Sequence, residues 1–165
     1  MAKQKQSGRR VLLIDDTVSI HEDVQKALSH SSVSANEAVD ELEGQLFEDG
    51  EEQVSGQTGS QHTYSLSAYS GGAEGFAAFE AAQGTEGFHL AIVDYRMPGG
   101  WDGVMTIEKL WSVQADLPVL LCTAYSDEES ENKIKSGLKG KGPWALLHKP
   151  FNPAELKEAI EALLG

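Results

Sequence analysis

The stretch HLAIVDYRMPGGWDG, residues 89–103, carries the pattern that decides the fold. A short run of apolar residues begins at Leu90 and leads straight to the carboxylate of Asp94, and a Met-Pro-Gly-Gly turn follows. Apolar runs of this length between turn signals are typical of strands that are buried on both faces. The stretch therefore predicts a buried strand with an acid at its carboxyl end, and the position of that acid needs an explanation.

Three other stretches have the same apolar character, and a fourth alternates between apolar and polar residues. They are RRVLLIDD at 9–16, LPVLLCTA at 117–124, WALLHKP at 144–150 and the alternating TYSLSAYS at 63–70. Helical patterns stand between or after these strands, over residues 18–30, 72–82, 102–114, 126–139 and 152–165. Strands that alternate with helices predict a doubly wound α/β fold, in which a five-stranded parallel sheet is covered by helices.

Cap residues support the starts of two of these helices. Ser126 or Asp127 is a suitable cap for the helix that follows the third apolar strand, and Asn152 is suitable for the last helix. Pro153 then takes the first helical position, where its missing N–H group costs no hydrogen bond. These residues predict well-defined amino ends for both helices.

One segment interrupts the alternation of strands and helices. Residues 31–62 contain no Lys or Arg and hold eight acids, which are Glu37, Asp40, Glu41, Glu43, Glu48, Asp49, Glu51 and Glu52. The part from 36 to 47 has apolar residues at helical spacing, and the part from 48 to 62 has the Gly, Ser, Gln and acid content of a solvated loop. We expect an acidic helix and loop, inserted after the first helix of a single domain that spans residues 1–165.

Composition excludes several classes of function. The chain has 165 residues, a net charge of -13 and one cysteine, Cys122, which lies in an apolar run. The charge argues against a nucleic-acid partner, and one cysteine cannot form a disulfide or a zinc framework. Nothing in the sequence resembles a signal peptide or a membrane span, so we expect a cytoplasmic location and no membrane partner.

Polar residues stand where the apolar strands end. Asp15 and Asp16 follow the first strand, Asp94 and Thr123 end two others, and Lys149 follows the last. Parallel strands bring their carboxyl ends to one edge of the sheet, where open α/β proteins bind ligands. Three carboxylates in one place repel one another unless a cation lies between them, and oxygen ligands alone favour a hard ion such as Mg²⁺. The pattern predicts a Mg²⁺ site that holds a nucleophilic carboxylate, Asp94, beside an ammonium group, suited to attack on phosphorus.

These residues, in this order, resemble the receiver domain of two-component response regulators. The resemblance is carried by VLLIDD, IVDYRMPGGWDG, LLCTAYSD and HKPF and covers about residues 9–164. It implies a flavodoxin-like sheet with strand order 2-1-3-4-5, and Asp94 as the acceptor of a phosphoryl group. It also implies that Asp16 binds Mg²⁺ directly, that Asp15 binds it mainly through water, and that the backbone carbonyl of Arg96 completes the metal site with Asp94.

The same resemblance assigns the groups around the phosphoryl group. Thr123, the backbone of Ala124 and Lys149 are implied to bind it, with Lys149 joined to the next residue by a cis peptide bond. Arg96 and Tyr125 are implied to lie at the rim and to tune the loss of phosphate. The implied partners are a sensor histidine kinase as donor, and an output domain, a downstream protein or a second copy of the chain as the receiver of the signal. No enzymatic activity beyond phosphorylation and dephosphorylation of Asp94 is implied.

Two features refine the resemblance. The stretch YRMPGGWDG and the extended segment after the first helix are similar to receivers attached to histidine kinases or cyclic-di-GMP enzymes. Receivers usually carry an aromatic residue three positions before the lysine, and here that position is Leu146. Trp144 lies two residues earlier and is expected on the same face of the strand, since side chains alternate along a strand.

Two other functions compete with a switching receiver. A phosphatase of the haloacid dehalogenase type also forms an aspartyl phosphate, but it requires Asp-x-Asp on the first strand, and Thr17 stands where its second acid belongs. The other alternative is a receiver-like module that does not switch and serves for docking or dimerisation, which the presence of Leu146 favours. The histidines show no metal-ligand spacing, so we assign none of them to the site.

Overall fold

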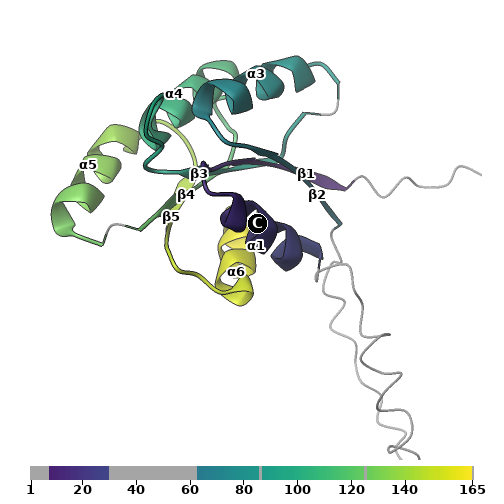
Figure 1. Ribbon diagram of the computed structural model, residues 1–165. Coiled ribbons are helices and arrows are strands. Elements are labelled where there is room, and N and C mark those ends of the chain that lie inside the picture. The colour runs from purple at the N-terminus through teal and green to yellow at the C-terminus, as the bar shows by residue number, and fades with distance from the viewer. Residues whose placement is uncertain (1–7, 30–62, 86, 125, 165) are drawn as a thin grey trace, which may run out of the picture.

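The computed structural model describes residues 8–29, 63–85, 87–124 and 126–164. These residues form five strands and five helices in strict alternation (Figure 1). The strands are β1 (Arg9–Ile14), β2 (Tyr64–Tyr69), β3 (Leu90–Asp94), β4 (Val119–Thr123) and β5 (Trp144–His148). The helices are α1 (Val18–Ser29), α3 (Gly72–Ala82), α4 (Gly103–Val113), α5 (Glu128–Leu138) and α6 (Pro153–Leu164). The strands and helices predicted for this part of the chain are confirmed, and each end lies within two residues of its predicted position.

The five strands form one parallel sheet in the order β2-β1-β3-β4-β5. Figure 1 shows α3, α4 and α5 on one face of this sheet and α1 and α6 on the other. The order and the two helical layers confirm the flavodoxin-like fold. The acidic insertion predicted at 31–62 lies entirely within residues 30–62, outside the described part of the chain, so its structure stays a prediction.

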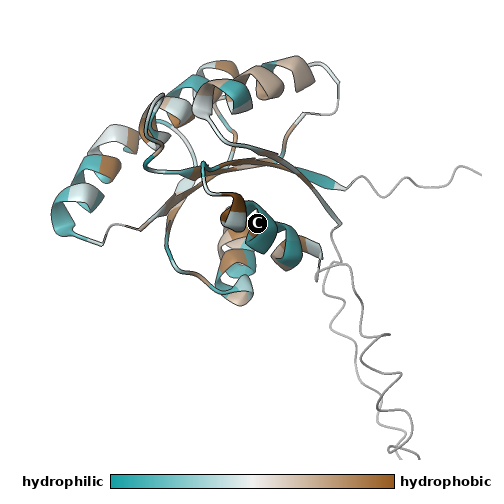
Figure 2. Cartoon of the chain, viewed as in Figure 1, coloured by the Kyte–Doolittle hydropathy of each residue, from teal (hydrophilic) through white to brown (hydrophobic). Residues whose placement is uncertain are grey.

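Two apolar cores hold the layers together, one on each side of the sheet. On the side of α3, α4 and α5, the core includes Phe79, Ile107 and Leu110, none of which is exposed to solvent. On the side of α1 and α6, it includes Val24 and Ile160. β3 and β4 are buried along their whole length, because their residues contribute to both cores, and the strands accordingly form the brown centre of Figure 2. The continuous apolar runs in the sequence are explained by this double burial.

Three helices begin at caps made by side chains. The carboxylate of Asp102 accepts from the N–H of Met105 at the start of α4. The carboxylate of Asp127 accepts from the N–H of Ser130 at the start of α5, so Asp127 rather than Ser126 is the cap of this helix. At α6, Asn152 and Glu155 form a reciprocal capping box, with N–H to oxygen distances of 2.8 and 3.1 Å. These caps fix the amino ends of the helices, and therefore the loops that precede them.

The two ends of the predicted insertion join the sheet at its amino edge. α1 begins just after β1 and runs back along the sheet, so that Ser29 ends the helix at the opposite edge. The chain returns to the sheet at this amino edge with Thr63, whose carbonyl accepts from the N–H of Arg9, the first residue of β1.

Among the described residues, no helix is long and apolar enough to cross a bilayer.

Candidate phosphoacceptor and metal site

The residues predicted at the strand ends lie together at the carboxyl edge of the sheet. Asp15 follows β1, Asp94 is the last residue of β3, Thr123 is the last residue of β4 and Lys149 follows β5. They surround or border a hollow of about 290 Å³, which is lined by Asp16, Thr17, Ile20, Asp94, Arg96, Thr123, Ala124 and Lys149. The structure thus brings together residues that are up to 134 positions apart in the chain.

Lys149 is the central cation of this edge. Its Nζ atom donates to Oδ2 of Asp15 over 2.6 Å and to Oδ1 of Asp94 over 3.2 Å. Its backbone N–H donates to the carbonyl of Thr123, and a cis peptide bond joins it to Pro150. The lysine side chain is 15% exposed and the Asp15 side chain 1% exposed, so their charges interact in a largely desolvated place.

Three carboxylates form a cluster that suits a divalent cation. One oxygen from each of Asp15, Asp16 and Asp94 lies within 4.8 Å of the others. Asp15 and Asp94 are buried, whereas Asp16 is exposed toward the hollow. Oxygen-only ligands at this separation fit the preference of Mg²⁺, and they do not fit a soft metal that seeks Cys or His. The donor set is therefore consistent with the Mg²⁺ site that the sequence predicts.

Electrostatics set Asp94 apart from an ordinary acid. Burial and the charge of Asp15 raise the pKa of Asp94 from its ordinary value of 3.8 to about 6, although Lys149 acts in the opposite direction. Burial lowers the pKa of Lys149, but the contacts with Asp15 and Asp94 outweigh it, so its pKa is raised overall. The ammonium group is thus held in its charged form, and one lysine does not fully compensate three acids. A further cation would relieve that imbalance.

The start of α4 packs against the backbone of Asp94 and Tyr95. A Cβ atom on Gly103 would lie 2.5 Å from the carbonyl oxygen of Asp94 and 2.8 Å from the Cα atom of Tyr95. The N–H of Gly103 donates to the carbonyl of Tyr95 over 2.9 Å. The glycine in the quoted stretch is therefore required by a close approach of two backbones, and this approach fixes the loop after Asp94.

The rim residues are only partly described. Arg96 and Ala124 are exposed and line the hollow, where Arg96 and the backbone of Ala124 were predicted. Tyr125 lies outside the described residues. The roles of Arg96 and Tyr125 in tuning the loss of phosphate therefore stay predictions. Leu146 and Trp144 pack against the same core, on the side of α3, α4 and α5, which confirms that they share a face of β5.

Two histidines, His21 and His148, make contacts that the sequence does not signal. Nε2 of His21 lies 2.6 Å from the carbonyl oxygen of Asp15. Nε2 of His148 lies 2.9 Å from a carboxylate oxygen of Glu131, which joins the end of β5 to α5. No spacing in the sequence signals either contact, because each pairs a ring with an atom from another element or loop.

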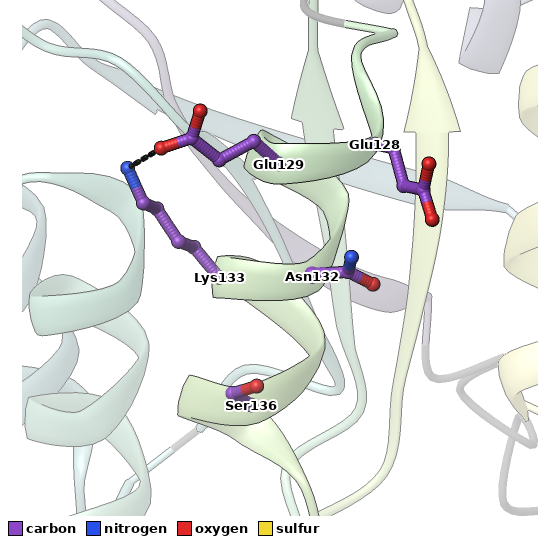
Figure 3. Close-up of a pocket in the computed structure, with 5 residues that line it drawn as sticks. All are labelled: Glu128, Glu129, Asn132, Lys133 and Ser136. Carbon is purple, nitrogen blue, oxygen red and sulfur yellow. Dashed lines mark ion pairs between the residues drawn. The ribbon is translucent and has the colours of Figure 1, made fainter.

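A larger but shallower hollow runs along the outer side of α5. Figure 3 shows the five side chains that line it, with Lys133 paired to Glu129 over 2.8 Å. All five belong to one exposed face of the helix, and none of them lines the hollow beside the acid cluster. We assign the chemistry to the smaller hollow, where the buried acids and the lysine meet.

Comparison with known proteins agrees with the fold. The model of the response regulator receiver domain family matches residues 48–161, which is more than half of the chain. The chain therefore belongs to the response regulator receiver domain family. The match begins after β1, although the structure places β1 between β2 and β3 and Asp15 and Asp16 directly after it. The segment 30–62 separates β1 and α1 from the rest of the family pattern. No curated protein matches the chain.

Solved structures of receivers share this fold. A CheY-like receiver domain protein from Methanospirillum hungatei superposes with a TM-score of 0.63 at 22% identity, over 96% of this chain and 94% of that one. The CheY of a CheX-CheY-BeF3-Mg complex from Borrelia burgdorferi gives 0.65 at 13%, over 95% and 90%. The receiver domain of a modulated diguanylate cyclase from Desulfovibrio desulfuricans gives 0.63 at 19%, over 96% and 94%. At these identities the likeness establishes the fold.

Proposed function

We propose that Asp94 accepts a phosphoryl group from the phosphohistidine of a sensor kinase, and that this modification controls a partner or output domain. The observation that carries the proposal is the position of Asp94. It ends the central strand β3, beside two other acids and within 3.2 Å of the ammonium of Lys149. A carboxylate oxygen of Asp94 attacks phosphorus, the P–N bond breaks, and an acyl phosphate forms.

The neighbours of Asp94 have distinct parts in this proposal. Asp15, Asp16, Asp94 and the carbonyl of Arg96 would hold Mg²⁺, which supplies positive charge against the phosphoryl oxygens when bound. Lys149 provides a second positive charge through Nζ, the atom that already contacts Asp94. The hydroxyl of Thr123 and the backbone of Ala124 line the same hollow and donate hydrogen bonds to the transferred group.

A direct test measures the intact mass after incubation with acetyl phosphate. With Mg²⁺, the wild-type chain is expected to gain the mass of one phosphoryl group, and without Mg²⁺ it is expected to gain little. Asp94→Asn is expected to gain none. Asp116→Asn is a matched control, because Asp116 is an exposed acid in the loop between α4 and β4, and it is expected to react like wild type. An adduct that persists in Asp94→Asn would contradict the proposal.

The second candidate function, a docking module that does not switch, is favoured by Leu146. This residue takes the place of the aromatic side chain that receivers usually carry on the last strand. Amide hydrogen exchange of the phosphorylated and unphosphorylated chains distinguishes the candidates. Changed exchange over α5 and β5 supports a switch, and an adduct without any such change supports docking alone.

A further inference from the structure

We infer that His21 positions the pair of metal-binding acids, by fixing the peptide group that joins Asp15 to Asp16. This inference rests on the proposed function, because it concerns how the same site is held in shape. His21 lies in the first half of α1, and its ring is partly buried. Its Nε2 atom lies 2.6 Å from the carbonyl oxygen of Asp15, on the loop that leads into the same helix.

The direction of this hydrogen bond follows from its partner. A carbonyl oxygen can only accept, so Nε2 of His21 carries the hydrogen and donates it. The carbonyl of Asp15 has left the ladder of the sheet, since the register of β1 with β2 ends at Ile14 and Tyr69. Asp15 is only 1% exposed, and a buried carbonyl at such a place needs a donor from elsewhere. His21 supplies it.

The other polar groups of Asp15 are also engaged. Its N–H donates to the carbonyl of Tyr69 over 3.0 Å. Its carboxylate accepts from the N–H of Thr17 over 2.9 Å and from Lys149 over 2.6 Å. With the bond from His21, all four polar atoms of Asp15 have partners. The residue is therefore fixed in orientation as well as in position.

The consequence falls on Asp16, because the Asp15 carbonyl and the Asp16 nitrogen belong to one planar peptide group. Fixing the carbonyl fixes that plane, and the bond from the Thr17 N–H to the Asp15 carboxylate holds the peptide group that follows Asp16. Together these two contacts set the direction in which the Asp16 side chain leaves the loop. Asp16 is exposed and lines the hollow, and from the described residues its carboxylate accepts one long hydrogen bond, of 3.4 Å, from the Thr17 hydroxyl. Its orientation therefore depends on the backbone. α1 is anchored under the sheet by Val24, Ala27 and Leu28, so the ring is held by a rigid element.

The test compares three variants for Mg²⁺ affinity, by calorimetric titration with magnesium chloride, and for unfolding in urea without metal. His21→Leu keeps the bulk of the ring and loses the donor. His21→Gln keeps a donor at about the reach of Nε2. His89→Leu is the matched control, because Nδ1 of His89 accepts from the N–H of Arg10 at the amino edge of the sheet, far from the acids.

His21→Leu is expected to weaken Mg²⁺ binding about tenfold, the lower end of the loss seen when a residue that orients metal ligands is removed. His21→Gln is expected to recover most of that loss, and His89→Leu to bind Mg²⁺ like wild type. The inference is overturned if His21→Leu retains the wild-type affinity, or if His21→Gln binds as weakly as His21→Leu. It is also overturned if both leucine variants lose stability and neither loses affinity, because His21 would then have only a structural role.

Two further comparisons keep the test decisive. If His21→Leu does not fold, His21→Asn replaces it, because asparagine is polar but one methylene too short for the carbonyl. Weak Mg²⁺ binding by His21→Asn with recovery by His21→Gln supports the inference, and equal affinities overturn it. The wild-type chain separates this question from the proposed function. A wild type without Mg²⁺ binding contradicts both, whereas a wild type that binds beside unchanged His21 variants contradicts the positioning role alone.

Discussion

The ammonium of Lys149 lies 2.6 Å from the carboxylate of Asp15, closer than its 3.2 Å distance from Asp94. The lysine is therefore held more closely by the buried Asp15 than by Asp94, the residue that we propose as the phosphoacceptor. This arrangement keeps a positive charge beside Asp94, which lines the hollow. It also makes the charge state of Asp94 sensitive to any change at Lys149.

Replacing Lys149 by methionine is expected to raise the pKa of Asp94 above its value of about 6. The charge and the hydrogen bond of Lys149 both lower that pKa, so their removal leaves burial and Asp15 unopposed. Carbon-13 NMR titration of the aspartate carboxyls, without Mg²⁺, measures the shift. Lys141→Met is the control, because Lys141 is exposed and pairs with Glu108 on α4. An unchanged or lower pKa of Asp94 in Lys149→Met would speak against this electrostatic account.

Asp94→Asn is expected to stabilise the metal-free protein at pH 7.5 but not at pH 4. A carboxyl with a raised pKa binds its proton more tightly in the folded state. Its stabilising contribution is therefore complete below pH 3.8 and is lost as the pH rises through about 6. At pH 7.5 Asp94 is ionised, and its burial beside Asp15 destabilises the folded state. Asp94→Asn removes this destabilisation, which amounts to about 1–2 kcal/mol after the lost contact with Lys149 is allowed for. Urea unfolding at both pH values measures the difference. Equal effects at the two pH values would contradict the raised pKa.

Mg²⁺ is expected to stabilise the folded chain, and chelation is expected to remove that effect. A ligand that binds only the folded state adds about 1.4 kcal/mol when its free concentration is ten times its dissociation constant. Asp16→Asn is expected to lose most of the stabilisation, since it removes one of the three clustered carboxylates. Thermal unfolding with increasing magnesium chloride measures the stabilisation of both proteins, and calcium-free buffers exclude competition from Ca²⁺. Equal stabilisation of wild type and Asp16→Asn would argue against the assigned site.

Gly103→Ala is expected to destabilise the protein, whereas Gly100→Ala is expected to have little effect. The new Cβ atom at position 103 meets the backbone of Asp94 and Tyr95, and neither α4 nor β3 moves without disturbing the core. Forced overpacking of this kind costs about 1–3 kcal/mol or more. A Cβ atom on Gly100 meets nothing within 4 Å. Urea unfolding of the two variants provides the comparison, and similar stabilities would show that the loop after Asp94 adapts to the extra atom.

The strand ends and the acid cluster could be predicted because they follow from chain direction and burial. The runs that contain Leu90 and Leu120 are apolar throughout, so they had to be buried strands. An acid such as Asp94 at their carboxyl ends then had to lie at the common edge. The cis bond at Lys149 and the carbonyl of Arg96 as a metal ligand followed from resemblance alone, and neither is derivable from the spacing of residues.

Other contacts could not be predicted because they depend on the exact angle between elements. The bond from His21 to the Asp15 carbonyl requires a particular distance between α1 and the loop before it, which no residue pattern encodes. The pairing of His148 with Glu131 depends likewise on where α5 lies against β5. The cap at Asp102 differs from these, because an aspartate directly before a helical pattern is a visible signal.

Ser29 and Thr63 both lie at the edge of the sheet opposite the acids, and this geometry makes that edge a suitable site for inserting a segment. The chain between them has 33 residues, numbered 30–62. Doubling the length of such a connection costs only about 0.6 kcal/mol of closure entropy if the added residues are flexible. A fluorescent reporter or a recruiting peptide inserted between Ser29 and Thr63 would be attached to the domain at the edge of the sheet opposite Asp94. The two ends of the segment 30–62 thus lie at one edge of the sheet, and the acid cluster lies at the other.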